Sequence, residues 1–247
     1  MDMDLHNRRT IRKYASTPVS DQLLKDLLQL AARSSNTGNM QTYSVVVTRD
    51  EKQKELLSPA HFNQPMVKQA PVVLTFCADY NRFTEWCKCR QAEPGYDNFQ
   101  SFIAAAIDAI VWAQTFAVAA EREGLGICYL GTTTYNAHQI IEVLHLPRLV
   151  IPVVTLTLGY PDDMPELQDR LPLEAILHDE RYHEATKEDI DRWYAEKESL
   201  PSMKQFVAEN KKETLAQVFT DVRYTRKNNE YFSNVLLEVL KKQGFLG

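Results

Sequence analysis

Runs of apolar residues predict a set of buried strands in the first two thirds of the chain. Residues 43–48, 72–77 and 149–158 are rich in β-branched side chains and do not alternate with polar ones, which is typical of strands buried on both faces. Residues 125–130 form a shorter run and predict a further strand. Pro152 lies inside the 149–158 run, and because proline has no backbone N–H we expect it near a strand start or at a sheet edge.

Helical spacing of apolar residues appears in three regions. After Ser20, which suits a helix N-cap, leucines recur at helical spacing as far as Ala31. Residues 99–123 are apolar nearly all round, as expected of a central helix that is covered on every side. A partner subunit is one way to cover such a helix. Residues 137–144 predict a short helix.

The composition changes after Pro161. An extended connector is followed by a highly charged helical stretch at 187–212 and by an amphipathic terminal helix at 231–242. Strands and helices therefore alternate early in the chain, whereas the late part is helical. We expect an α+β fold in a single domain over residues 1–247, with a core up to about residue 160 and a helical C-terminal extension beyond it.

Composition and charge exclude several classes of protein. Of the 247 residues, 33 are acidic, 28 are basic and 44% are hydrophobic, whereas a disordered chain has fewer apolar residues and more net charge. The formal charge of −5 argues against a nucleic-acid partner, whose phosphates favour a basic face. Four cysteines and six scattered histidines lack the spacing of metal ligands, so we expect no metal site and no disulfide framework.

The apolar pattern also gives no reason to expect a membrane partner. Met1 to His6 is acidic and no apolar run follows it, so we expect no secretory signal. The longest apolar stretch, residues 99–120, is interrupted by Asp108 and Gln114, which favours a buried helix over a membrane span. We therefore expect a cytoplasmic protein.

A compact group of cations near the start of the chain is the first candidate for chemistry. Arg8, Arg9, Arg12 and Lys13 surround the hydroxyl of Thr10. A guanidinium presents a planar fork of donors that matches phosphate, and a threonine hydroxyl adds another donor. The segment is therefore a candidate anion site, and a solvated basic turn is the alternative.

Three further segments carry weaker signals. Residues 34–41 combine Asn and Gln amides, which can bond to an amide-like ring edge, with Gly38, which lets the backbone approach a planar ligand; a helix-to-strand loop explains them equally well. Gly131 follows a predicted strand and can present a free backbone N–H, although a plain turn is the alternative. Arg170 is held by Pro172, two residues further on.

Taken in order, these segments resemble the nitroreductase family of FMN-dependent oxidoreductases. The terminal Leu240–Phe245 is similar to the NADPH nitroreductase and flavin reductase group within that family. The matching motifs are Arg8–Tyr14 followed by Pro18–Ser20, Gly38–Gln41, Phe76–Arg82, Gly124–Gly131, Leu158–Pro161 and Arg170–Pro172.

The resemblance implies a fold, a cofactor and a reaction. The family fold is a central, mainly antiparallel sheet flanked by helices, in a homodimer with two FMN sites at the subunit interface. The implied activity is ping-pong hydride transfer from NADPH or NADH through FMN N5 to a small-molecule acceptor: a nitroaromatic, a quinone or a flavin. A flavin reductase or enone reductase of the same family, or a non-enzymatic FMN-binding module, are the alternatives.

The resemblance also assigns roles to single residues. Arg8 and Thr10 would hold the FMN phosphate, with Arg170 as a second phosphate contact. Arg12 would lie beside the pyrimidine edge of the flavin, where its charge makes it the catalytic candidate. Gln64 would reach the polar edge of the ring. The Leu130 and Gly131 backbone would approach N5. The residues that would line the flavin from the partner chain are Ser34, Ser35, Asn36, Gly38, Asn39 and Gln41.

Two departures from the family pattern bear on binding. Gln168 stands where the family often carries Lys, so one phosphate cation is either missing or replaced by Arg9 or Lys13. The group also has basic residues for the NADPH 2′-phosphate in the C-terminal extension. By position, the candidates here are Arg223, Arg226 and Lys227.

Overall fold

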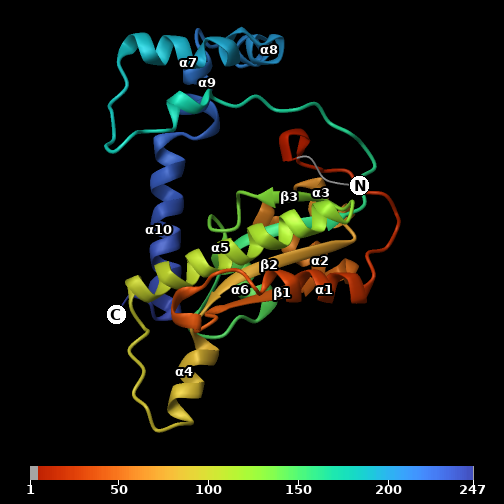
Figure 1. The fold of residues 1–247 in the computed structure, drawn as a ribbon, viewed down its shortest axis with the longest axis vertical. Helices are drawn as coiled ribbons and strands as arrows, with labels where there is room; N and C mark the ends of the chain where they lie inside the picture. Colours follow the sequence, from red (N-terminus) through yellow and green to blue (C-terminus); the bar gives the residue numbers. More distant parts are fainter. Residues whose placement is uncertain (1–4, 247) are drawn as a thin grey trace. The chain divides into compact units, whose positions relative to one another are not determined.

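The computed structural model describes residues 5–246 (Figure 1), so the acidic opening of the chain up to residue 4 lies outside it. The described chain divides into two compact units. The first unit contains the described residues up to Glu166 and those from Phe232 onward, and the second is Leu167–Tyr231.

The first unit is built on an antiparallel sheet of four strands in the order β1-β2-β4-β3. The strands are β1 (Tyr43–Thr48), β2 (Val72–Asp79), β3 (Gly126–Leu130) and β4 (Val150–Gly159). Every residue of β2 is buried. The predicted strands and the mainly antiparallel sheet are therefore confirmed.

Pro152 occupies the third position of β4, a central strand that pairs with both β2 and β3. The alternative that placed it at a sheet edge is therefore wrong, and the strand-start alternative is confirmed. The register between β2 and β4 shifts at this point, since Cys77 pairs with Pro152 but Phe76 pairs with Val154. This bulge accommodates a residue that has no N–H to donate to the ladder.

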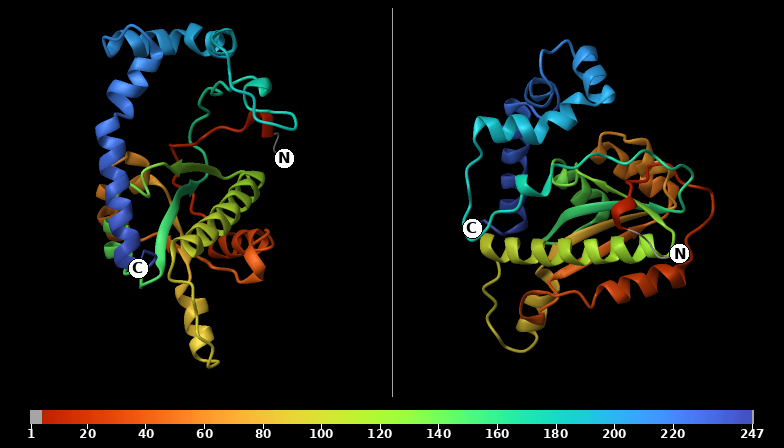
Figure 2. Two further views of the ribbon diagram at one scale, coloured as in Figure 1. Left: turned by 90° about the vertical axis from the view of Figure 1, so that its left-hand side faces the viewer. Right: turned by 45° about the horizontal axis from the view of Figure 1, so that its top comes forward.

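Helices cover both faces of the sheet (Figure 2). On one face, α1 (Asp21–Ala31) and α5 (Phe99–Arg122) pack with Ile127 of β3 in the largest core cluster. The neighbouring Cys128 packs instead with helices of the other face, because successive strand residues point to opposite sides. Those helices are α2 (Glu51–Leu57), α3 (Pro65–Gln69) and α6 (Ala137–Leu144).

Shorter elements and the chain's last helix complete the first unit. The C-terminal half of α10 (Arg226–Gln243) packs through Val239 and Leu240 against Phe102 of α5. The remaining elements are η1 (Leu5–Asn7), η2 (Thr37–Asn39), η3 (Ser58–His61) and α4 (Asn81–Lys88).

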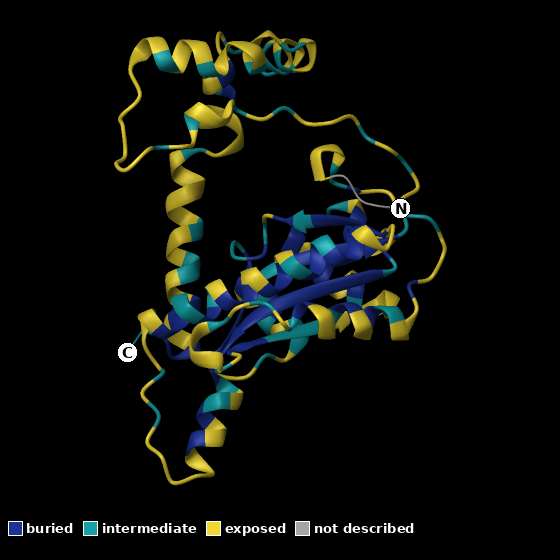
Figure 3. Cartoon of the chain, in the orientation of Figure 1, coloured by how far each residue is buried: buried dark blue, intermediate teal, exposed yellow. Residues whose placement is uncertain are grey.

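Helix α1 begins as predicted, with the Ser20 hydroxyl accepting a hydrogen bond from the Leu23 N–H at 3.1 Å. Helix α5 spans nearly the predicted range, and within one chain part of its surface is uncovered, so its being covered on every side stays a prediction. Four large apolar side chains of α5 are exposed: Phe99, Ile107, Ile110 and Val111 (Figure 3).

By length and composition alone, α5 is apolar enough to cross a membrane. Half of its most apolar window is buried inside the structure, where Ala109, Ala113 and Phe116 belong to the core beneath it. The helix is therefore a structural element of the first unit's core.

The second unit consists of short helices on an irregular backbone. The predicted helical stretch at 187–212 is two helices, because Pro201 starts a new one and cannot continue the preceding helix. Helix α10 begins five residues before the predicted start at 231, since its first turn is polar and shows no apolar spacing. The elements are η4 (Leu173–Ala175), α7 (Lys187–Ser199), α8 (Pro201–Glu209), α9 (Leu215–Val218) and η5 (Phe219–Arg223).

Candidate functional site

The N-terminal segment is fixed along β3. The Ile11 N–H donates to the Ile127 carbonyl at 3.0 Å, and the Ile11 side chain is buried. Gly126 makes this approach possible, because a Cβ there would lie 2.6 Å from Ile11. Three residues further on, Tyr14 donates from its hydroxyl to the Ile11 carbonyl at 2.8 Å, and its ring lies against Gly159. The backbone that carries the predicted cations is therefore held by β3 and β4.

Arg8 and Arg12 gather beside the end of β3. Arg8 Nε forms an ion pair of 3.2 Å with Oε1 of Glu121, a buried carboxylate in the last turn of α5. Burial raises the pKa of Glu121, and the Arg8 charge opposes that rise. Burial also raises the pKa of the Cys128 thiol in β3, against the opposing charges of Arg12 and Arg8. The predicted cations therefore form one cluster around β3.

The other two N-terminal candidates are half-buried. Arg9 donates from Nη1 to the Asn7 carbonyl at 2.7 Å. Its Nε is buried and has no hydrogen-bond partner within residues 5–246. Thr10 lies between Arg9 and the anchored Ile11.

The loop that follows β3 in the chain begins at Gly131. A Cβ at Gly131 would meet no atom within 4 Å, so a ligand can approach its backbone. Leu130 is buried, and its carbonyl accepts a hydrogen bond of 3.0 Å from the Thr133 hydroxyl. The residue after Gly131 is Thr132, and its hydroxyl lies 2.9 Å from Nδ1 of His61.

His61 joins this loop to Gln64, another predicted site residue. The His61 carbonyl accepts hydrogen bonds from both the backbone N–H and the side-chain Nε2 of Gln64, at 3.2 and 3.1 Å. The His61 side chain is completely buried, and burial lowers its pKa to about 4. Sequence reasoning missed this residue, because its partner Thr132 is 71 positions away in the chain.

The loop from Ser34 to Gln41 is anchored to a different part of α5. Buried Asp108 accepts hydrogen bonds of 3.0 Å from the backbone N–H and the hydroxyl of Thr37. The Asn36 side-chain oxygen accepts from the Gln41 N–H at 3.2 Å. The loop is therefore held in one conformation by side-chain hydrogen bonds.

Three residues of this loop have a left-handed backbone: Gly38, Asn39 and Gln41, with φ of 57°, 52° and 55°. Glutamine rarely adopts this conformation. The Arg82 guanidinium donates to the Gln41 carbonyl and helps to hold it. Ser35 is exposed, whereas the Ser34 hydroxyl is buried and has no partner among the described residues.

The two groups of predicted flavin residues are anchored at different points along α5, the helix that lies across the sheet in Figure 1. The loop is bonded to Asp108 and the cation cluster to Glu121, thirteen residues further along the helix. With a rise of about 1.5 Å per residue, their anchors are about 20 Å apart. One chain therefore does not bring the loop and the cation cluster together.

The remaining predicted phosphate residues, Gln168 and Arg170, belong to the second unit. Arg170 is exposed and donates from Nη1 to the carbonyls of Asp169 and Gln168, at 2.8 and 3.3 Å. Asp169 forms an ion pair of 2.8 Å with Lys197 of α7, which fixes this part of the connector. The phosphate contacts of Gln168 and Arg170 stay predictions.

The candidates for the NADPH 2′-phosphate lie close together in the chain and are exposed. The Arg223 guanidinium lies over the Phe206 ring at 5.4 Å. Arg226 pairs with Glu230 at 3.6 Å. Their role in nucleotide binding stays a prediction.

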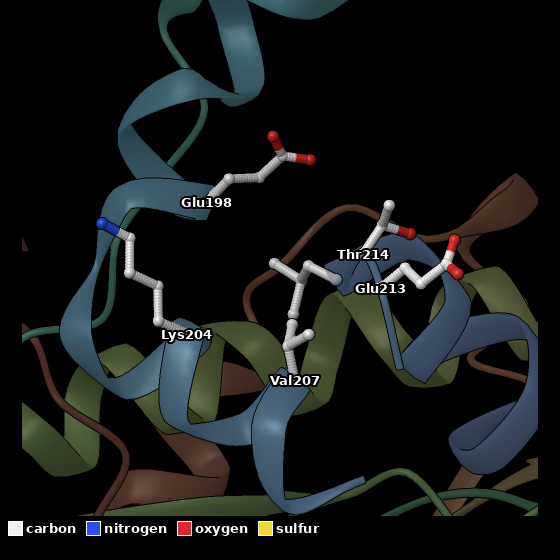
Figure 4. Close-up of a pocket in the computed structure, with 6 residues that line it drawn as sticks. Glu198, Lys204, Val207, Glu213 and Thr214 are labelled. Carbon is white, nitrogen blue, oxygen red and sulfur yellow. The ribbon is translucent and has the colours of Figure 1, made fainter. Parts of the chain in front are cut away.

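A hollow of about 270 Å³ lies within the second unit (Figure 4). Its lining is Glu198, Lys204, Val207, Glu213, Thr214 and Leu215. None of the predicted flavin residues contributes to it.

The model of the Nitroreductase family matches residues 5–160, a range that includes the cation cluster, the loop at 34–41 and the whole sheet. This chain belongs to the nitroreductase family. The family fold explains the observed antiparallel sheet with helices on both faces.

Two known proteins are similar to nearly the whole chain, and a third is similar to a shorter part of it. A crystal structure of a Bacteroides fragilis protein assigned as an oxidoreductase is 61% identical, with a TM-score of 0.98 over 98% of this chain and 99% of that one. The oxygen-insensitive NADPH nitroreductase of Salmonella typhimurium is 30% identical over 98% of this chain and 96% of its own. The FMN reductase [NAD(P)H] of Bacillus subtilis is 33% identical over 72% of each.

Proposed function

We propose that this chain is an FMN-dependent NAD(P)H oxidoreductase that reduces nitroaromatic, quinone or flavin acceptors by a ping-pong mechanism. The observations that support the proposal are the position of Arg8 and Arg12 near Cys128 of β3 and the open backbone of Gly131, the residue that follows β3 in the chain. Two of the relatives are named as an FMN reductase and an NADPH nitroreductase.

The residues present fit the chemistry of FMN. Arg9 Nε and Ser34 Oγ are buried without a hydrogen-bond partner among the described residues. A buried polar group left unpaired costs about 1–3 kcal/mol, so a ligand that bonds to these atoms would be stabilised. The open face of Gly131 would admit a planar ring.

The cation cluster is suited to a phosphate. Glu121 bonds Arg8 through Nε, which orients the guanidinium and leaves its far edge to face an anion. Arg9 and Thr10 add donors from the neighbouring positions. Because Lys13 is paired with Asp163 at 3.6 Å, we propose Arg9 rather than Lys13 as the cation that compensates for Gln168.

Bound FMN would supply the hydride chemistry itself, by accepting hydride from a nicotinamide and passing it to the acceptor. The chain's residues bind and orient. Arg12 would place positive charge at the pyrimidine edge of the ring. In a site that excludes water, this charge would stabilise negative charge on the ring more strongly than it would in water. Gln64 would reach the polar edge of the ring, and the Leu130 and Gly131 backbone would approach N5.

We also propose that the functional unit is a homodimer. The loop at 34–41 and the cation cluster are anchored about 20 Å apart on α5, so each needs a complement from elsewhere. Two copies that pair along α5 in opposite directions would join the loop of one copy to the cluster of the other. The exposed Ile107, Ile110 and Val111 of α5 would be covered in such a pair.

The same features suit the cytoplasm. The four cysteines are free thiols, and disulfides are rare in reducing compartments. Helix α5 is half-buried in the core. We therefore propose a cytoplasmic enzyme without a membrane partner.

The direct test of the activity is optical. Purified protein should carry flavin absorbance that bleaches on anaerobic addition of NADPH or NADH. Arg12→Ala should slow the bleaching, and Arg8→Ala should lose FMN, while Arg90→Ala serves as a charge-matched control at an exposed site. Flavin that no nicotinamide bleaches would identify a binding module instead, and protein that takes up no FMN would contradict both functions.

The shared site can be tested by complementation. A chain with Arg8→Ala and Arg12→Ala is co-expressed with a chain that carries Asn39→Ala and Gln41→Ala. If the two halves of each site come from different chains, each mixed dimer has one intact site, and random pairing restores about one quarter of wild-type flavin. Complete absence of complementation would contradict a shared site.

A further inference from the structure

We propose that His61 is a positioning residue, whose ring fixes Thr132 and thereby holds the loop after β3 against the corner that carries Gln64. The proposal rests on the proposed function, because that function gives Gln64 and the Gly131 backbone their importance. His61 itself would touch neither FMN nor substrate.

The contacts of His61 connect two segments that the sequence separates. Its ring reaches the Thr132 hydroxyl at 2.9 Å, directly beside Gly131. Its carbonyl accepts both the backbone and the side-chain N–H of Gln64. One residue therefore sets the distance between the two predicted contacts to the flavin ring.

Neighbouring residues strengthen the same connection. Asn136, at the end of the loop, donates from Nδ2 to the Ala60 carbonyl at 2.9 Å. The Phe62 and Tyr135 rings lie 6.5 Å apart between centroids. Neither of these contacts involves the Thr132 side chain, which bonds to His61. The His61 bond therefore acts together with the Tyr135 N–H, which donates to the Thr132 carbonyl at 3.1 Å, and with the Thr133 hydroxyl, which donates to the Leu130 carbonyl.

His61 is buried at a cost that a residue serving only to fill space would not have. Its side chain is fully buried, yet Nε2 has no hydrogen-bond partner within the described chain. A leucine would fill a similar space without leaving a buried polar atom unpaired, which costs free energy. The bond from Nδ1 to Thr132 is the gain that offsets this cost.

Burial also keeps the ring neutral. The pKa of His61 is lowered to about 4, so no charge develops beside the loop near neutral pH. A neutral imidazole can donate or accept at Nδ1, and either direction suits the Thr132 hydroxyl.

The test compares three substitutions at one position. His61→Asn keeps a polar atom near the place of Nδ1, His61→Gln moves it near the place of Nε2, and His61→Leu removes it. Hydrogen exchange of the amides at 131–136 is measured in protein stripped of FMN, so this readout does not depend on the proposed function. We expect exchange to rise about three- to tenfold in His61→Leu and His61→Gln, as for one lost hydrogen bond, and to stay near wild type in His61→Asn.

The partner residue supplies an independent arm. Thr132→Val keeps the shape of the side chain and removes the hydroxyl, so it should reproduce the exchange of His61→Leu, and the double variant should add nothing further. This arm also decides the matter if His61→Leu does not fold. Wild-type exchange in Thr132→Val, or rescue by glutamine rather than asparagine, would overturn the proposal.

A second readout uses the FMN-loaded protein. In Thr132→Val we expect anaerobic flavin reduction to slow about tenfold while the FMN dissociation constant stays within about twofold, because orientation rather than affinity is lost. A loss of FMN affinity with an unchanged reduction rate would contradict positioning. Failure of wild-type protein to bind FMN would contradict the proposed function alone and leave the exchange result standing.

Discussion

Each of the two units of this chain is stabilised internally, but by different interactions. In the first unit, every residue of β2 is buried, and side chains as large as Phe76 and Phe116 have no exposed surface. In the second unit, α7 and α8 contribute no buried residue, and the described buried apolar residues are Leu215 and Val218 (Figure 3).

Local bonds take the place of a core in the second unit. Capping boxes start α7 at Thr186 with Asp189, and α9 at Thr214 with Gln217. Such contacts contribute about 1 kcal/mol each, whereas apolar burial contributes in proportion to area. We therefore expect the second unit to open locally at lower free energy than the first unit unfolds.

The largest contrast should come from deleting an aromatic ring in each unit. Phe116→Ala removes a fully buried ring that contacts Phe76, and should lower the free energy of unfolding by about 3–5 kcal/mol. Phe206→Ala removes a half-buried ring beneath Arg223, and should change global unfolding by about 1 kcal/mol or less. Urea unfolding of both variants measures the difference, and equal losses would contradict the contrast.

The second prediction concerns acid. The pKa of His61 is about 4 in the folded protein and 6.5 in the ordinary case, so the unfolded state takes up a proton first as pH falls. Stability should therefore decrease between pH 6.5 and about 4, by about 3 kcal/mol in total. His61→Asn should lack this decrease. His183→Asn, at an exposed position of the second unit, is the control, and unfolding curves at stepped pH decide between them.

Removing a helix cap should have a smaller effect. The loss of stability should be similar in the two units, but it should be detected by different measurements. Ser20→Ala and Thr186→Ala each remove a side-chain acceptor at a helix start, at a cost of about 1 kcal/mol. The loss at Ser20 should appear in global unfolding, because α1 packs in the core through Leu24 and Leu27. The loss at Thr186 should appear only as faster hydrogen exchange in α7. A global effect of Thr186→Ala would show that the units unfold together.

The smallest effect should come from an exposed ion pair. Lys187 and Asp191 pair across one turn of α7 and both are exposed. Such pairs contribute about 0.3–0.5 kcal/mol and are screened by salt. Asp191→Asn should therefore speed exchange in α7 by about twofold at most, and the difference should vanish in high salt. A larger or salt-independent change would mean that the pair acts through another contact.

The local part of this fold could be predicted from the sequence. Helix α6 has the predicted bounds, and β2 extends only two residues beyond the predicted run, because burial of these elements imprints an apolar pattern. Pro201 is also a local signal for a helix start, although the predicted helical stretch at 187–212 runs across it. The polar first turn of α10 carries no such pattern, so its start was placed late.

The candidate site was only partly predictable, for a physical reason. Arg8, Arg12 and Gly131 stand out by residue type, so the sequence alone makes them candidates. Glu121 and His61 act through partners far away in the sequence, so no spacing reveals them. The loop at 34–41 is anchored on Asp108 and the cation cluster on Glu121, and these two residues belong to one helix. The anchors are therefore about 20 Å apart. Only the folded structure shows these two contacts.

The contact between Gly126 and Ile11 allows charge and position to be varied separately. An alanine at 126 would collide with Ile11 and displace the segment that bears Arg8 and Arg12, although every guanidinium would still be present. Arginine-to-alanine changes alter the amount of charge, while a single added methyl group alters only where it stands. We therefore expect Gly126→Ala to weaken binding of the proposed anion without removing any positive charge.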